Sequence, residues 1–176
     1  MRNRQRRKTA LSMESQIKIN STIKESIVDG PGIRYVVFAQ GCPHGCKGCH
    51  NPQTHDVNGG VFAEVDDIFM EIEENPLLSG VTFSGGEPFL QPVPLCRLAK
   101  KVRNIGKSIM IYTGYTIEHL IEMGRVDAAV TELLRLCDTL VDGPYIDAQR
   151  DLTLKFRGSA NQRIIELKDY DFNATK

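Results

Sequence analysis

The hydrophobic residues of this chain fall into short runs and helical stripes, which alternate along the sequence. Apolar, β-branched and aromatic residues fill four short runs, at residues 33–39, 81–83, 109–112 and 139–141. Runs of this length and composition are typical of strands buried on both faces, as in a parallel sheet. A short alternating run at 17–19 and a late one at 163–167 predict two further strands.

Three stretches between these runs carry apolar residues at helical spacing. In residues 63–74 the apolar side chains recur at i, i+3, i+4 and i+7, with acidic residues on the opposite face. A second stripe covers residues 93–105 and is followed by Gly106, a residue suited to the end of a helix. The third lies between residues 116 and 136, where Gly124 is expected to divide it into two helices.

Alternating strands and helices predict an α/β fold, with mainly parallel strands joined by right-handed helical crossovers. A closed eight-unit barrel needs roughly 200 residues or more, and this chain has 176. We therefore expect an open, partial (β/α) barrel. The length suits one domain, expected over residues 15–176, behind a basic leader at residues 1–14.

Polar and glycine-rich segments follow four of the expected strands at the point where each strand ends. They are residues 42–49, 85–87, 113–114 and 142–143. Ligands of parallel α/β folds bind outside the carboxyl ends of the strands, where such loops meet. The four loops are therefore predicted to form one site on one rim of the sheet.

Composition and charge argue against a membrane protein and against a nucleic-acid-binding surface on the body of the chain. The chain is 41% hydrophobic and 25% charged, as in an ordinary soluble protein, and no apolar run approaches the ~20 residues that a membrane span needs. Residues 1–8 hold five positive charges and no acid, while the remainder has 17 basic and 22 acidic residues. An acidic body makes a nucleic-acid surface unfavourable. The leader is expected to be disordered or to precede a later start at Met13, with contact to nucleic acid or to an acidic partner as the alternative.

The five cysteines do not suggest a disulfide framework, because their number is odd and three are clustered. The basic N-terminus is not followed by an apolar core, so it does not resemble a secretory signal. Both features predict a reducing, cytoplasmic location.

Cys42, Cys46 and Cys49 form a C-x3-C-x2-C cluster. Pro43 and the neighbouring glycines make a helix unfavourable there, so a loop is expected in which the three thiolates converge. Convergent thiolates bind zinc or an iron–sulfur cluster. Three ligands leave one coordination position open, whereas a closed zinc site would need a fourth. His44, His50, Cys96 or Cys137 could supply it.

The other loops offer complementary groups. Gly85 and Gly86 let a ligand approach the backbone closely, and Glu87 adds an acceptor suited to a cationic amine. Asp29 and Asp142 are carboxylates at turns, which either cap their own turns or face a ligand. A polar cluster of donors follows later in the chain, formed by Arg157, Asn161, Gln162 and Arg163.

These motifs resemble a known family. The cysteine spacing is similar to the cluster loop of radical S-adenosylmethionine (SAM) enzymes, and residues 28–34 and 50–52 resemble glycyl-radical-enzyme activases in particular. The segments 45–52, 112–115, 141–145 and 157–163 resemble the activases of anaerobic (class III) ribonucleotide reductases. The resemblance covers residues 17 to about 168. Gly48 departs from the wider superfamily, where an aromatic residue often precedes the last cysteine, but the reductase activases tolerate glycine there, which favours the narrower resemblance.

The resemblance implies a [4Fe–4S] cluster on Cys42, Cys46 and Cys49, with SAM bound to the open iron. Gly85, Gly86 and Glu87 would hold the methionyl amine. Thr113 and Asp142 would lie on the carboxylate or ribose side of SAM. The residues implied to face the partner protein are Asp29, Arg157, Asn161 and Arg163.

The implied activity is the reductive cleavage of SAM, with an electron from a donor such as flavodoxin or ferredoxin. The resulting 5′-deoxyadenosyl radical would take a hydrogen atom from one glycine of an anaerobic ribonucleoside-triphosphate reductase. Two alternatives stay open at this point. One is an activase for a formate-lyase type of glycyl-radical enzyme, and the other is a zinc-binding interaction module.

Overall fold

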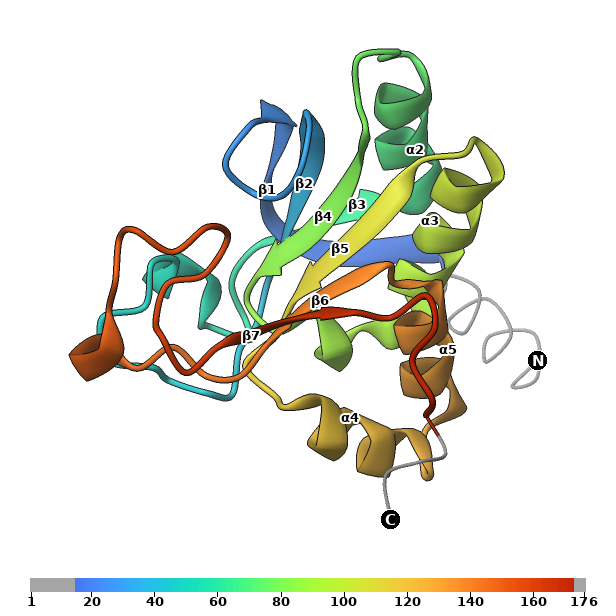
Figure 1. The fold of residues 1–176 in the computed structure, drawn as a ribbon. Helices are drawn as coiled ribbons and strands as arrows, with labels where there is room; N and C mark the ends of the chain where they lie inside the picture. The colour runs from blue at the N-terminus through green and yellow to red at the C-terminus, as the bar shows by residue number, and fades with distance from the viewer. Residues whose placement is uncertain (1–14, 173–176) are drawn as a thin grey trace.

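The computed structural model describes residues 15–172 (Figure 1), so the basic leader expected at 1–14 lies outside the described residues. The strands are β1 (Gln16–Ser26), β2 (Arg34–Ala39), β3 (Val61–Glu64), β4 (Gly80–Gly85), β5 (Ser108–Tyr112), β6 (Thr139–Asp142) and β7 (Arg163–Glu166). The helices are α2 (Val65–Glu73), α3 (Pro92–Asn104), α4 (Ile117–Gly124) and α5 (Ala128–Leu136). Short 3-10 turns occur at Pro52–Thr54, Pro88–Leu90 and Asp147–Gln149. The predicted helices are confirmed, including the division at Gly124.

Within the described residues the strands form one sheet in the order β3-β1-β2-β4-β5-β6-β7. β2, β4, β5 and β6 pair in parallel, and helices connect them. β1 pairs antiparallel with both β2 and β3, and β7 pairs antiparallel with β6. Because β3 is antiparallel to β1, it runs in the same direction as β2. Most strands therefore point the same way, and the sheet stays open between its edges β3 and β7, as expected for a partial barrel.

The sequence did not predict two features of this sheet. β3 was missed, and β1 extends well beyond the expected residues 17–19. β1 and β2 are joined by a short turn rather than a helix, so they pair as an antiparallel hairpin.

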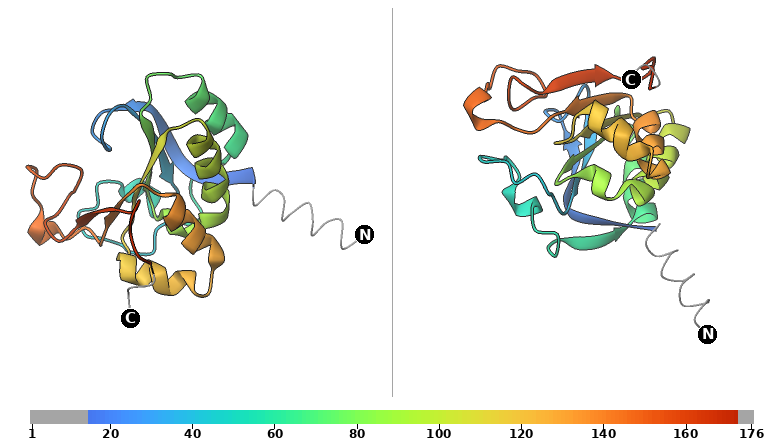
Figure 2. Two further views of the ribbon diagram at one scale, coloured as in Figure 1. Left: turned by 45° about the vertical axis from the view of Figure 1, so that its right-hand side comes forward. Right: turned by 90° about the horizontal axis from the view of Figure 1, so that it is seen from below.

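The helices pack on one face of the sheet. Figures 1 and 2 show α2, α3 and α5 on one side, with the long loops after β2 and β6 projecting from the sheet's end. Alternate strand residues, such as Val37, Phe83 and Ile111, join the helices in one buried hydrophobic core. The intervening residues point to the opposite face, and that face is also largely buried. The prediction of strands buried on both faces is thus confirmed.

A buried arginine organises the face opposite the helices. Arg34 is 1% exposed, and its guanidinium donates to Thr82 Oγ1 at 2.6 Å, Ser108 Oγ at 3.0 Å and the Val81 carbonyl at 2.5 Å. Burial lowers the pKa of Arg34. The Thr82 hydroxyl in turn donates to the Asp29 carbonyl at 2.7 Å. Arg34 therefore ties three strands together and fixes the turn that precedes β2.

Candidate functional site

A pocket of about 450 Å³ lies at the carboxyl ends of the parallel strands. Residues from all four predicted strand-end loops line it, and so do residues of the β1–β2 turn and of the loop before β7. The lining residues expected from the sequence are Asp29, Cys42, Cys46, Cys49, Gly85, Gly86, Thr113, Gly143, Arg157 and Gln162. The prediction that these loops share one site is confirmed.

The cysteine loop follows β2 and is shaped by glycines. Gly41, Gly45 and Gly48 have φ values of 97°, 58° and 76°, a backbone region that other residues rarely adopt. The loop is fastened at its start, where the Cys42 amide donates to the His55 carbonyl at 3.2 Å. Cys49 N donates to Cys46 O at 3.2 Å, which closes a turn. The predicted loop conformation is therefore confirmed.

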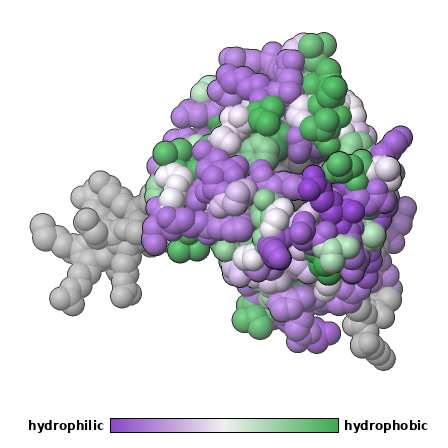
Figure 3. Space-filling view, turned by 90° about the vertical axis from the view of Figure 1, so that its left-hand side faces the viewer, coloured by the Kyte–Doolittle hydropathy of each residue, from purple (hydrophilic) through white to green (hydrophobic). Residues whose placement is uncertain are grey.

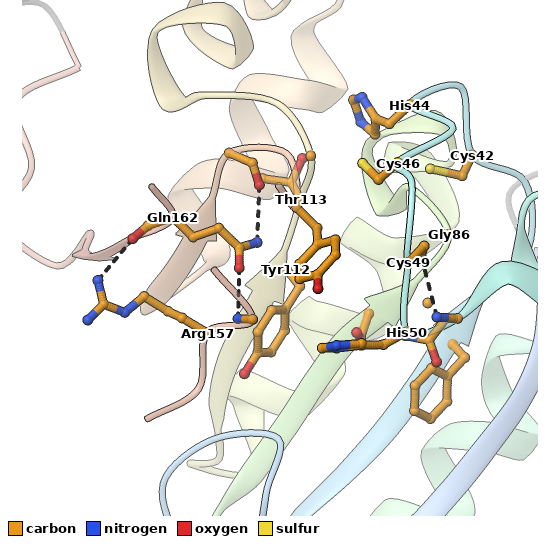
Figure 4. A pocket seen from close by; sticks show the side chains of 18 of the residues that line it. Cys42, His44, Cys46, Cys49, His50, Gly86, Tyr112, Thr113, Arg157 and Gln162 are labelled. Carbon is orange, nitrogen blue, oxygen red and sulfur yellow. Dashed lines mark hydrogen bonds between the residues drawn. The ribbon is translucent and has the colours of Figure 1, made fainter. Parts of the chain in front are cut away.

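The three cysteines are free and half-buried, and all three line the pocket. In Figure 4 they lie on one loop along one side of the pocket, with Tyr112, Thr113 and Gln162 across from it. Burial raises the pKa of the Cys42 thiol, while a hydrogen bond from the His44 main chain opposes the rise. Soft thiolate donors in this number fit an iron–sulfur cluster with one open iron.

The arrangement does not resemble a closed site for a single ion. Among residues 15–172, no group of three or more His, Cys, Asp or Glu side chains is placed to hold one metal ion. A [4Fe–4S] cluster is wider than one ion, so its thiolates stand further apart. A closed zinc site would need a fourth ligand around one point in addition to the three thiols.

The paired glycines serve a close approach between two chain segments. A Cβ on Gly86 would lie 2.3 Å from the Gly41 carbonyl oxygen, and a Cβ on Gly85 would lie 2.7 Å from Phe38 Cα. Two hydrogen bonds of 2.8 Å hold the segments together, from Gly86 N to Ala39 O and from Glu87 N to Gly41 O. The glycine loop, residues 85–87, therefore holds the start of the cysteine loop in place, and its two glycines also line the pocket.

Glu87 lies beneath the pocket wall rather than in it. Its side chain is fully buried, and Oε2 contacts His44 Nε2 at 2.7 Å. Gly114 N donates to Oε2 and Phe89 N donates to Oε1, each at 3.0 Å. The Thr113 hydroxyl lies 2.9 and 3.0 Å from the two carboxylate oxygens. Thr113 itself lines the pocket, as expected, although its hydroxyl is already bonded.

Asp142 is also turned away from the pocket. It is 1% exposed, and its Oδ2 accepts from the Ile117 amide, at the start of α4, at 2.7 Å. Arg163 Nε donates to Oδ1 at 2.9 Å, and Arg163 Nη2 donates to Oδ2 at 2.5 Å. Arg163 also pairs with Glu118 at 2.8 Å. Hydrogen bonds to Asp142 and Glu118 raise the pKa of Arg163, and the bond from Arg163 lowers the pKa of Glu118 to about 2.

The residues expected to face a partner divide into two groups. Asp29 and Arg157 line the pocket, and Arg157 Nε is buried with no hydrogen-bond partner in the described part of the chain. Asn161 instead donates to the Pro144 carbonyl at 2.8 Å and accepts from Ser159 Oγ at 2.7 Å. Asn161 and Arg163 thus stabilise their own loop and strand, and neither is among the residues that line the pocket.

Several pocket residues were not selected from the sequence. Tyr112 lines the pocket from the end of β5, and burial raises the pKa of its hydroxyl. Tyr145 packs near Gly48, where an added Cβ would lie 3.4 Å from the Tyr145 ring and 2.8 Å from Asp147 Oδ1. The strand period could have indicated Tyr112, because it alternates with core-facing Ile111. Tyr145 belongs to the segment 141–145 that the sequence singles out, but its contact with His50, on a distant loop, could not be read from the chain.

Known proteins resemble this chain over most of its length. Residues 28–165 match the family described as "4Fe-4S single cluster domain". The chain is 35% identical over 151 residues to the anaerobic ribonucleoside-triphosphate reductase-activating protein of Escherichia coli K12, covering 81% of this chain and 94% of that protein. Proteins of the same name from Vibrio cholerae and Enterobacteria phage T4 are 36% and 33% identical, covering 78% of this chain and 90% and 86% of their own lengths.

A solved structure, QueE from Escherichia coli, aligns with 57% of this chain and 54% of its own, at 22% identity and a TM-score of 0.46. The sequence relatives and the family match carry the assignment. The family match covers the cysteine loop, residues 85–87 and the sheet from β2 almost to the end of β7. This chain therefore belongs to the family of anaerobic ribonucleoside-triphosphate reductase-activating proteins, and it carries a 4Fe–4S single cluster domain.

Proposed function

We propose that this protein activates an anaerobic ribonucleoside-triphosphate reductase through reductive cleavage of SAM at a [4Fe–4S] cluster. The observation that carries the proposal is the convergence of three free thiols and a glycine loop on one pocket. When bound, the cluster and SAM supply the 5′-deoxyadenosyl radical that removes a hydrogen atom from a glycine of the reductase. The protein's own residues bind, orient and shield these groups.

Cys42, Cys46 and Cys49 would hold the cluster, because they are the free thiols that line the pocket. The main chain of residues 85–87 would receive the methionyl amine. Gly85 and Gly86 line the pocket and carry no side chain, so an ammonium donor would be able to approach their main chain closely.

Thr113 would border the carboxylate or ribose of SAM, since it lines the same wall. Asp142, expected on that side too, would act indirectly. Its carboxylate fixes the start of α4 and the strand end from which Gly143 reaches the pocket. Direct contact between Asp142 and SAM would require both of its present partners to move.

Asp29 and Arg157 would face the glycine-bearing segment of the reductase, because both line the pocket. Exposed apolar residues support a protein partner on this side. Val28 lines the pocket and is 72% exposed, and Leu152, near the lining residue Leu154, is 79% exposed. Figure 3 shows hydrophobic groups standing among hydrophilic ones on the face that carries these loops.

Three further parts of the proposal concern the setting of the reaction. The electron donor is a protein such as flavodoxin or ferredoxin, and the protein works in the cytoplasm as a single domain over residues 15–176. Among residues 15–172, none of the helices has the length and apolar character that a membrane crossing requires.

Anaerobic reconstitution followed by reduction tests the function. The protein should bind iron and sulfide, cleave SAM, and generate a glycyl-radical EPR doublet when mixed with an anaerobic reductase. Cys49→Ala is the matched control and should prevent cluster assembly. A doublet on a formate-lyase type of enzyme, with none on the reductase, would assign the activity to the alternative partner. Failure of the reduced wild-type protein to cleave SAM would refute the proposal.

A further inference from the structure

We propose that Glu87 is a positioning residue whose carboxylate locks His44, and with it the Cys42–Cys46 segment, in place. This role deepens the proposed function and rests on it, because it concerns the loop that would carry the cluster. It differs from the expectation that the Glu87 side chain binds the methionyl amine. The geometry points to a lock through three features: the burial of Glu87, the packing of His44 and the exposure of the rest of the loop.

The first feature is the environment of Glu87. The carboxylate is fully buried, and its oxygens lie within 3.0 Å of the His44 ring, the Thr113 hydroxyl and the amides of Phe89 and Gly114. Burying a carboxylate is unfavourable unless several donors satisfy it. Here the donors come from the loops after β2, β4 and β5, so the one side chain joins three loops. Its two oxygens are therefore occupied by the protein itself.

The second feature is the close packing around the His44 ring. A Cβ on Gly114 would lie 2.3 Å from His44 Cδ2, so the ring packs directly on the Gly114 backbone. The Tyr115 ring meets it edge-on at 4.5 Å and is stacked in turn on His119 at 5.0 Å. The ring is thus held between Gly114 and Tyr115, with Nε2 directed at Glu87. The hydrogen bond and the packing together fix both the position and the rotation of His44.

The third feature is the exposure of the other residues between the three cysteines, which leaves the His44 side chain as the main contact of this segment with the rest of the protein. Pro43, Gly45 and Lys47 are exposed, whereas the His44 side chain is only 15% exposed. An added Cβ on Gly45 would meet nothing within 4 Å. The main chain of His44 also hydrogen-bonds Cys42. Fixing the His44 ring therefore sets the direction of the Cys42 and Cys46 side chains before anything binds.

The test uses the full chain without its cluster and four variants. Glu87→Gln weakens the lock, because each Glu87 oxygen accepts a backbone amide, from Phe89 or Gly114, and the Gln side chain has only one oxygen. In either orientation the new amide nitrogen would face an N–H donor. His44→Met removes the donor at similar size, and His44→Gln can restore a donor near the position of Nε2. The double variant combines Glu87→Gln with His44→Met.

The readout is hydrogen–deuterium exchange at the Cys42 and Cys49 amides, which are bonded in the fastened loop. We expect about tenfold faster exchange in Glu87→Gln and in His44→Met, as for the loss of one hydrogen bond, and near-normal exchange in His44→Gln. Because both changes break one contact, the double variant should be no worse than the worse single variant. After reconstitution, the same variants should lose iron to a chelator correspondingly faster.

Wild-type exchange in His44→Met, or fully additive effects in the double variant, would overturn the proposal. Weaker SAM binding in Glu87→Gln, with wild-type exchange and wild-type iron loss, would return Glu87 to the amine-binding role. If Glu87→Gln fails to fold by circular dichroism, the His44→Met and His44→Gln pair decides the question. The exchange measurement needs no cluster or SAM, so its result is separate from any failure of the wild-type protein to cleave SAM.

Discussion

Replacing Asp142 with Asn should destabilise the protein more than it weakens SAM binding. The substitution keeps the shape of the side chain and removes its charge. Asp142 Oδ1 accepts from Arg163 Nε, while Oδ2 accepts from the Ile117 amide and Arg163 Nη2. Whichever way the Asn amide is turned, its NH₂ group faces one of these donors. At least one hydrogen bond is lost, and a donor that is at least partly buried is left without its acceptor.

The magnitude follows from burial and exposure. Removing one partner of a buried ion pair costs about 3–5 kcal/mol. Asp142 is buried, but the Arg163 side chain is 47% exposed and keeps its contact with Glu118. Water therefore satisfies part of the released guanidinium, and we expect a loss of about 2–3 kcal/mol in the free energy of unfolding. For a domain of this size, that loss corresponds to a fall in Tm of about 4–12 °C.

Thermal and urea unfolding of the cluster-free protein would measure the effect. Glu118→Gln is the matched control, because it removes the exposed partner of the same arginine and should cost under about 1 kcal/mol. SAM binding to the reconstituted variant would be measured in parallel. The reasoning is refuted if Asp142→Asn unfolds like the wild type, or if SAM affinity falls while stability is unchanged.

Four other predictions concern separate parts of the structure. Gly86→Ala should cost about 1–3 kcal/mol and lower the iron bound after reconstitution, because its Cβ would lie 2.3 Å from the Gly41 carbonyl oxygen; unchanged unfolding and iron content would contradict it. Arg34→Met should cost about 3 kcal/mol and speed proteolysis of the turn before β2, since several buried acceptors lose their donor, whereas the half-exposed Arg103→Met should change little. The pKa of Glu118 is lowered from 4.5 to about 2 in the folded state, so its stabilising contribution is complete above about pH 4.5 and is lost as pH falls towards 2. Because Glu118 is half-exposed, its contribution to the free energy of unfolding should stay under about 1 kcal/mol. When the free energy of unfolding is measured against pH, Glu118→Gln should not show this loss at acid pH. Arg157→Ala should spare uncoupled SAM cleavage and reduce glycyl-radical formation, and loss of both activities would place Arg157 in the SAM site instead.

Much of the fold could be predicted because its signals are local. The buried strands β2, β4, β5 and β6 are continuous apolar runs, and the helices between them carry stripes at helical spacing. β3 was missed because it is four residues long and lies at the edge of the sheet, with Val61 and Phe62 exposed. The outer part of β1 alternates weakly for the same reason, since most of its residues from 21 to 25 are exposed.

The location of the site could also be predicted, but the direction of its side chains could not. The strand ends and the cysteine spacing can be recognised in the sequence, and from them Cys42 and Gly86 were correctly expected to line the same pocket. The carboxylates of Glu87 and Asp142 depend on partners far away in sequence, namely His44, 43 residues distant, and Arg163, 21 residues distant. Only the folded chain reveals that these acids are turned inward, toward donors on neighbouring loops.

The wall formed by the loop between β6 and β7 has a consequence for biosynthesis. Tyr145, Arg157 and Gln162 close one side of the pocket, yet they follow Cys49 by about a hundred residues. Because the ribosome delivers the chain from its N-terminus, the cysteine loop leaves the exit tunnel well before this wall can fold over it. During that interval the three thiols are open to solvent on more sides than in the finished protein. Synthesis in the presence of oxygen would therefore expose them to oxidation at the stage when they are least covered.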